Sequence, residues 1–114
     1  MHIPLARHTL LELHGCTAAM LNDPAALKSI LLEAVRLGHG TIVTEVFHTF
    51  SPHGVSGVVV IAESHVAIHT WPEHGYAAVD IFSCGTKLDH AIIRDHLRTG
   101  LAATNVEARE LARG

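Results

Sequence analysis

The sequence predicts an α+β domain in which two helices cover one face of an antiparallel β-sheet. Three observations predict it: a length of 114 residues, two helical patterns, and four consecutive strand-like segments joined by short turns. A chain of this length folds around one core, and no repeat or linker-like stretch divides it, so residues 1–114 are expected to form a single domain. Short turns between successive strands favour antiparallel pairing, and the predicted order is β-α-β-β-β-β-α-β.

The first helix is predicted over residues 24–37. Asp23 is a suitable N-cap, Pro24 fits the first helical position, and Gly38 can end the helix. Its apolar residues recur at helical spacing, which indicates one buried stripe made of Leu27, Ile30, Leu31 and Ala34.

The second helix is predicted over residues 87–102. Thr86 is expected to be its N-cap, and Asp89 lies in the predicted first turn, where a negative charge is favourable. The residues expected to face the core are Ile92, Ile93, Leu97 and Leu101.

The strands are predicted from segments rich in Val, Ile, Thr and aromatic residues. Turns at residues 51–54 and 72–75 separate some of them. The predicted strands span residues 7–13, 40–49, 56–62, 65–71, 76–83 and 106–112. Both helices are expected to cover the same face of the resulting sheet.

The turn at residues 72–75 has the residue types of a four-residue hairpin loop. If Trp71 pairs with Tyr76, Cys84 returns opposite Glu63. Strand alternation then predicts that one sheet face carries His65, His69, Trp71 and Cys84. The hairpin is therefore expected to gather the Ser64 hydroxyl, the His69 imidazole and the Cys84 thiol, although each residue alone has an ordinary structural explanation.

The segment from Gly54 to Gly85, GVSGVVVIAESHVAIHTWPEHGYAAVDIFSCG, closely resembles the small prokaryotic S-adenosylmethionine decarboxylases. Weaker similarity extends through Arg7-His8 and residues 41–44 and 47–50. The resemblance implies that this chain is made as a proenzyme, forms an active site at a dimer interface, and uses a pyruvoyl group. The roles it implies here are cleavage between Glu63 and Ser64, conversion of Ser64 to pyruvoyl, processing by His69 with help from Ser56, and proton donation by Cys84.

The implied chemistry is physically sound. A hydroxyl held against the preceding carbonyl reacts intramolecularly, with effective molarities of roughly 10⁵ to 10⁸ M, so Ser64 can attack Glu63 and give chains 1–63 and 64–114. Imidazoles exchange protons near neutral pH, which suits His69. The pyruvoyl ketone then forms a Schiff base with the substrate amine. A thiol is mostly protonated at pH 7, so Cys84 is a better proton donor than a carboxylate.

The substrate implied by the resemblance is S-adenosylmethionine, whose decarboxylated product donates aminopropyl groups in spermidine biosynthesis. Phe50 and Trp71 match family positions and can stack on adenine or the sulfonium, while Glu73 can bind ribose hydroxyls. Some proteins resembling this family act on basic amino acids, so a decarboxylase of arginine or ornithine is the main alternative.

The composition of the chain limits which binding partners and which cellular location are expected. The net charge is −3 and the eight basic residues are scattered, which predicts no nucleic-acid partner. The apolar run at residues 9–21 is interrupted and too short for a membrane span, and two unpaired cysteines fit the cytoplasm. A hydrophobic content of 48% predicts a homodimer or higher homo-oligomer.

Three other classes of protein are weighed against a pyruvoyl-dependent decarboxylase. A lysine-anchored pyridoxal cofactor is disfavoured because the chain has two lysines and a small scaffold. Eleven histidines allow a His-rich metal-binding protein, with candidate groups in His65, His69 and His74 or in His48 and His53, but no recognised ligand motif is complete and no metal site is predicted. A non-catalytic binding module is the third possibility.

Overall fold

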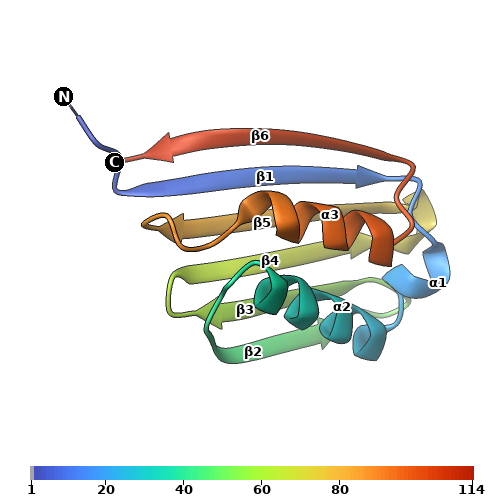
Figure 1. Ribbon diagram of the computed structural model, residues 1–114. Coiled ribbons are helices and arrows are strands. Elements are labelled where there is room, and N and C mark those ends of the chain that lie inside the picture. Colours follow the sequence, from blue (N-terminus) through green and yellow to red (C-terminus); the bar gives the residue numbers. More distant parts are fainter. Residues whose placement is uncertain (1) are drawn as a thin grey trace.

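The computed structural model describes residues 2–114 and contains a six-stranded sheet with two main helices on one face (Figure 1). The strand order is β2-β3-β4-β5-β1-β6, and every neighbouring pair is antiparallel. The strands are β1 (Ala6–His14), β2 (Ile42–Thr49), β3 (Val55–Ile61), β4 (Ser64–Trp71), β5 (Tyr76–Cys84) and β6 (Asn105–Arg113). The helices are α1 (Ala18–Leu21), α2 (Pro24–Leu37) and α3 (His90–Gly100), with a 3₁₀ turn at Pro72–His74. The predicted fold class and order are confirmed, while the short α1 was not predicted.

Helix α2 begins and ends where the sequence predicts. The Asp23 carboxylate accepts a hydrogen bond of 3.1 Å from the Ala26 amide, and Gly38 follows the last helical residue. Its buried stripe consists of Leu27, Leu31, Ala34 and Val35. Ile30, which the pattern places in the same stripe, is partly buried against the core.

Helix α3 is shorter than the predicted 87–102, and its cap is Asp89 instead of Thr86. The Asp89 carboxylate accepts a 3.0 Å hydrogen bond from the Ile92 amide, and the Asp89 amide is held by the Gly38 carbonyl. These contacts fix the preceding residues as a loop. Ile92 is exposed, contrary to the prediction, because the helix turns its inward stripe to Ile93, Leu97 and Leu101.

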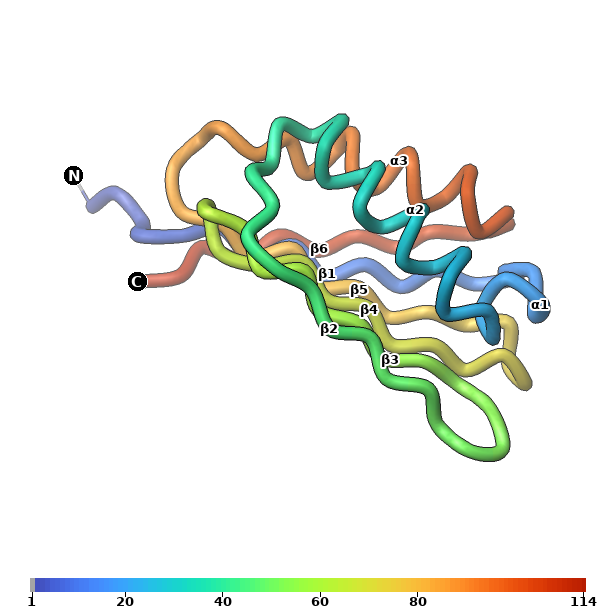
Figure 2. The backbone as a smooth tube through the Cα atoms, turned by 90° about the horizontal axis from the view of Figure 1, so that it is seen from below, coloured from blue at the N-terminus to red at the C-terminus, as the bar shows by residue number. Residues whose placement is uncertain are grey.

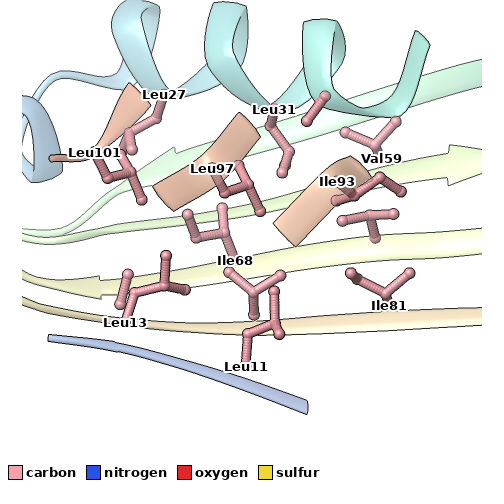
Figure 3. Close-up of a cluster of buried hydrophobic side chains, with 14 of the residues drawn as sticks. Leu11, Leu13, Leu27, Leu31, Val59, Ile68, Ile81, Ile93, Leu97 and Leu101 are labelled. Carbon is pink, nitrogen blue, oxygen red and sulfur yellow. The ribbon is translucent and has the colours of Figure 1, made fainter. Parts of the chain in front are cut away.

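The core lies between the helices and the sheet (Figure 3). Figure 2 shows α2 and α3 together on one side of the strands. Alternate strand residues such as Leu11, Ile68 and Ile81 are fully buried against them, and each such side chain contributes roughly 1.5–3 kcal/mol by burial. No helix within residues 2–114 has the length and apolar character to cross a bilayer.

The opposite side of the sheet has no helical cover in the described chain; we call it the open face. Strand pairing and alternation place apolar and aromatic side chains there from all six strands. The exposed apolar residues of the open face include Val46, Val58, Val60, Trp71 and Leu111. An uncovered apolar surface of this kind is typical of an interface.

Candidate active site

The β4–β5 hairpin has the predicted register. Trp71 pairs with Tyr76 and His65 pairs with Phe82, while the Cys84 amide donates a 3.0 Å hydrogen bond to the Glu63 carbonyl. This register confirms that His65, His69, Trp71 and Cys84 share a face, which is the open face. One end of the hairpin therefore carries Ser64 and Cys84, and the other carries Trp71; we call them the Ser64 end and the Trp71 end.

Ser64 is the first residue of β4 and follows the two-residue turn Ala62–Glu63 that joins β3 to β4. Its φ angle is +148°, a backbone conformation that side-chain-bearing residues seldom adopt. The Ser64 hydroxyl lies 3.5 Å from the His65 imidazole. Ser64 is thus a strained residue, and the carbonyl of the residue before it is already hydrogen-bonded to the Cys84 amide.

The Cys84 amide can activate this carbonyl for nucleophilic attack. A backbone N–H at 3.0 Å polarises the Glu63 carbonyl and can stabilise negative charge that develops on its oxygen. The thiol of the same residue is free and exposed, so it is accessible to a bound molecule. Cys84 therefore contributes two separate groups, a fixed amide and an accessible thiol.

The structure does not bring His69 to Ser64 within one chain. The two residues are five positions apart on β4, and five strand residues span roughly 17 Å. The His69 Nδ1 atom instead lies 2.8 Å from the hydroxyl of Ser56 on β3. Ser64 and Cys84 thus lie at the same end of the hairpin, while His69 belongs to a second cluster with Ser56.

This second cluster borders a pocket of about 280 Å³ at the Trp71 end. The pocket is lined by Phe50, His53, Ser56, His69, Trp71 and Glu73, with Gly54 and Thr70 completing the wall. It therefore unites the three predicted substrate-binding residues with the Ser56–His69 pair. Two larger cavities of about 520 and 530 Å³ are lined by residues near α3, β6 and the N-terminal segment, and none of the predicted site residues borders them.

Glu73 is held in an ionised, oriented state at the pocket wall. A hydrogen bond from its own backbone lowers the pKa of the Glu73 carboxyl, and the His53 imidazole, 2.8 Å from the carboxylate, lowers this pKa further. An anionic carboxylate facing a pocket is a suitable acceptor for hydroxyl groups.

Aromatic rings continue from the pocket across the Trp71 end. Trp71 and His14 both stack on Tyr76, with ring centroids 5.2 Å apart in each pair. Burial raises the pKa of Tyr76 to about 12, with a further contribution from the hydrogen bond that its hydroxyl donates to Glu12. Tyr76 therefore stays protonated and acts as a packing surface for Trp71.

The histidines do not form a metal cluster in the part of the chain that the structure describes. No group of three or more His, Cys, Asp or Glu side chains is arranged there to hold an ion. His65 stacks on Phe82 with centroids 5.6 Å apart, whereas His69 and His53 pair with Ser56 and Glu73. The histidines proposed as metal ligands are thus distributed among different partners.

Residues 7–114 match the model of a protein family described as S-adenosylmethionine decarboxylase. The chain belongs to this family. A relative from Acetivibrio thermocellus, named S-adenosylmethionine decarboxylase proenzyme, is 51% identical over 111 residues, which are 96% of this chain and 89% of the relative. A relative of the same name from Acidithiobacillus ferrooxidans is 44% identical over 110 residues, which are 96% of this chain and 83% of the relative.

A solved member of the family has the same fold. The crystal structure of the adenosylmethionine decarboxylase from Aquifex aeolicus superposes with a TM-score of 0.91 at 34% sequence identity, covering 99% of this chain and 93% of that chain. The family resemblance inferred from the sequence between Gly54 and Gly85 is therefore confirmed, and it extends over nearly the whole chain.

Sequence reasoning missed the groups that hold the predicted site residues in place. His53 was considered only as a metal ligand, and neither Thr41 nor Lys87 received any role. A usable signal existed for His53: because β3 and β4 are antiparallel, the turn before β3 and the loop after β4 lie at the same end of the strands, which places His53 beside Glu73. The same argument applies to Thr41, because Ile42 pairs with Ile61 and the start of β2 therefore lies beside the turn that follows β3. No comparable pattern links Lys87 to Glu63.

Proposed function

We propose that this chain is a self-processing, pyruvoyl-dependent decarboxylase of S-adenosylmethionine, acting in the cytoplasm and supplying the aminopropyl donor for spermidine. The observation that carries the proposal is the Glu63–Ser64 bond, where a strained serine follows a carbonyl held by the Cys84 amide. Its support is membership of a family whose 44–51% identical relatives are named proenzymes.

Maturation begins at this bond. The Ser64 Oγ atom attacks the Glu63 carbonyl carbon, the C–N bond breaks, and the hydroxyl proton passes to the freed amine, which leaves an ester. Loss of the Ser64 Cα proton and rupture of the Oγ–Cβ bond then release Glu63 as a carboxylate. The amine left at residue 64 rearranges to an imine, and water hydrolyses this imine to a ketone and releases ammonia. Chain 1–63 then ends in Glu63, and chain 64–114 begins with a pyruvoyl group. His69 and Ser56 serve as the proton-transfer pair of this sequence.

Turnover uses the groups around the mature site. The pyruvoyl group supplies a ketone that takes up the electrons released as carbon dioxide leaves. The exposed Cys84 thiol delivers the proton to the product. Phe50 and Trp71 bind the adenine or sulfonium by stacking, and the Glu73 carboxylate accepts hydrogen bonds from the ribose hydroxyls.

The distance between the two clusters leads us to propose a homodimer with shared sites. Ser64 and His69 of one chain are separated by about 17 Å of strand, so proton transfer between them needs a second copy. Two open faces packed with their ends reversed place the Ser56–His69 pair of one protomer against Ser64 of the other. Such a two-fold interface also covers the exposed valines of the open face.

The decarboxylase proposal is tested by carbon dioxide release from S-adenosylmethionine, arginine and ornithine, measured side by side on the same preparation. We expect release from S-adenosylmethionine alone, together with two chains of the masses of residues 1–63 and of pyruvoyl-started 64–114. Release from arginine or ornithine instead would reassign the substrate, and an active chain of uncut mass would remove the pyruvoyl mechanism.

The shared site is tested by co-expressing Ser64→Ala with His69→Ala chains. Alone, neither variant is expected to cut itself. A mixed dimer contains one site with both Ser64 and His69, so up to about half of the His69→Ala chains should become cleaved in the mixture. Mixed dimers that form but leave every chain intact would contradict the shared site.

A further inference from the structure

The side chain of Glu63 is fixed as firmly as its carbonyl. Its Oε1 atom accepts a 2.9 Å hydrogen bond from the Thr41 amide, and its Oε2 atom lies 3.3 Å from the Lys87 ammonium. Only 9% of the Glu63 side chain is exposed, whereas 60% of the Lys87 side chain is. An enclosed carboxylate in a turn thus has one donor on each oxygen.

Thr41 joins this arrangement to the turn itself. Its hydroxyl accepts a 3.0 Å hydrogen bond from Lys87, and its carbonyl accepts a 2.8 Å hydrogen bond from the Ala62 amide. The residue before β2, the β3–β4 turn and the segment after β5 are therefore linked through one residue. The Thr41 amide is the first cause of a lowered pKa of the Glu63 carboxyl, and the Lys87 ammonium adds to it, so the carboxylate is ionised.

From this geometry we propose that Lys87 is a positioning residue for self-cleavage, acting through the Glu63 carboxylate. The inference depends on the proposed cut between Glu63 and Ser64. Attack by the Ser64 hydroxyl requires the Glu63 carbonyl carbon to stay within reach while the carbonyl oxygen remains on the Cys84 amide. A Glu63 side chain anchored at both oxygens restricts rotation of the residue, and Lys87 supplies the only charged anchor among the contacts described.

This role differs from ordinary surface stabilisation. The Lys87 side chain is largely in solvent, and an ion pair with such an exposed partner contributes little to folding, so loss of Lys87 should leave the melting temperature nearly unchanged. Loss of orientation at a reacting carbonyl instead appears in the rate. Lys28 offers a matched control. Its ammonium lies 2.8 Å from the Glu45 carboxylate, so it also forms a partly exposed ion pair, but with a partner other than Glu63.

The test measures the first-order rate of self-cleavage of freshly made full-length chain, by denaturing gels and intact mass. Lys87→Met and Glu63→Gln should each slow cleavage about tenfold, and the double variant should be no slower than the worse single variant. Lys87→Arg should restore most of the rate, and Lys28→Met should keep it. Melting temperatures are compared in an uncleavable Ser64→Ala background.

The outcomes separate this inference from the proposed function. A wild-type chain that stays uncut would defeat the proposed function and this inference with it. A wild-type chain that cuts, with Lys87→Met within twofold of its rate, would overturn the role of Lys87 alone. Additive losses in the double variant, or a rate loss matched by a fall in the melting temperature, would also overturn it.

Discussion

The two ends of the open face differ in how their side chains are held. At the Ser64 end, the carbonyl and both carboxylate oxygens of Glu63 are hydrogen-bonded, and the following serine is conformationally strained. At the Trp71 end, Phe50 and Trp71 are 48% and 40% exposed around a pocket. A bond that must react with its own neighbour requires fixed atoms, whereas a site that admits a ligand requires accessible surface.

This difference predicts that substitutions at the two ends affect separable steps. Changes among the groups around Glu63 should act on maturation, and changes around the pocket should act on substrate binding. Two groups are exceptions. The Cys84 amide faces the Glu63 carbonyl while its thiol is exposed, and the Ser56–His69 pair lines the pocket although we propose that it acts in maturation. The following experiments test the separation in order of decreasing expected effect.

Replacing Cys84 by alanine should give the largest effect on turnover. The variant keeps the amide that binds the Glu63 carbonyl, so self-cleavage should proceed at close to the wild-type rate. If Cys84 is the proton donor, as we propose, its loss should lower kcat per pyruvoyl about 10²- to 10³-fold. Cleavage is followed by intact mass and turnover by carbon dioxide release.

The buried thiol of Cys16 provides the matched control for this experiment. Cys16 is enclosed by the core, and burial raises the pKa of its thiol, so it stays protonated away from the open face. Cys16→Ala should therefore keep turnover. Full activity in Cys84→Ala would remove the thiol from the reaction, and failure to cleave would mean that the side chain also acts in maturation.

Replacing Trp71 by alanine should affect only the Trp71 end. Loss of one aromatic contact with adenine or a sulfonium should raise KM about tenfold, whereas cleavage should not change. Trp71→Phe should recover part of the loss because a ring is retained. Steady-state kinetics normalised to pyruvoyl content measure the effect, and an unchanged KM would move the substrate away from this pocket.

The sequence predicts the arrangement along the hairpin better than the contacts around it. The register of β4 and β5 follows from the loop length between Trp71 and Tyr76, because a short loop leaves one pairing. The Lys87–Glu63 contact joins residues 24 positions apart and comes from the irregular segment after β5, which no periodicity encodes. The cap of α3 was misassigned for the same reason, since the Gly38 carbonyl selects Asp89 over Thr86.

The pair of His53 and Glu73 predicts a smaller effect at the Trp71 end. His53→Ala removes the partner that orients the Glu73 carboxylate and should raise KM about three- to fivefold without slowing cleavage. His53→Gln should recover part of the affinity because its amide can still donate a hydrogen bond. Equal KM values for both variants would mean that the imidazole has another role, and slower cleavage would break the separation of the two ends.

The smallest effect on activity is expected behind the Ser64 end, where pH acts on stability. Buried His90 lies 2.7 Å from the hydroxyls of Thr9 and Ser83, and Ser83 pairs with Ser64. Burial, followed by the charge of Arg7, lowers the pKa of His90 below its ordinary value of about 6.5.

The sign of the pH effect follows from proton binding. Because the pKa of His90 is lower in the folded chain, the unfolded chain binds more protons as pH falls below about 6.5, and the free energy of unfolding decreases. Above about pH 7.5 His90 is neutral in both states and contributes no slope. His90→Asn should flatten the loss of stability between pH 7.5 and 5, measured by urea unfolding. If the stability of His90→Asn depends on pH as steeply as that of the wild type, the pKa of His90 is not lowered in the folded chain and the prediction is wrong.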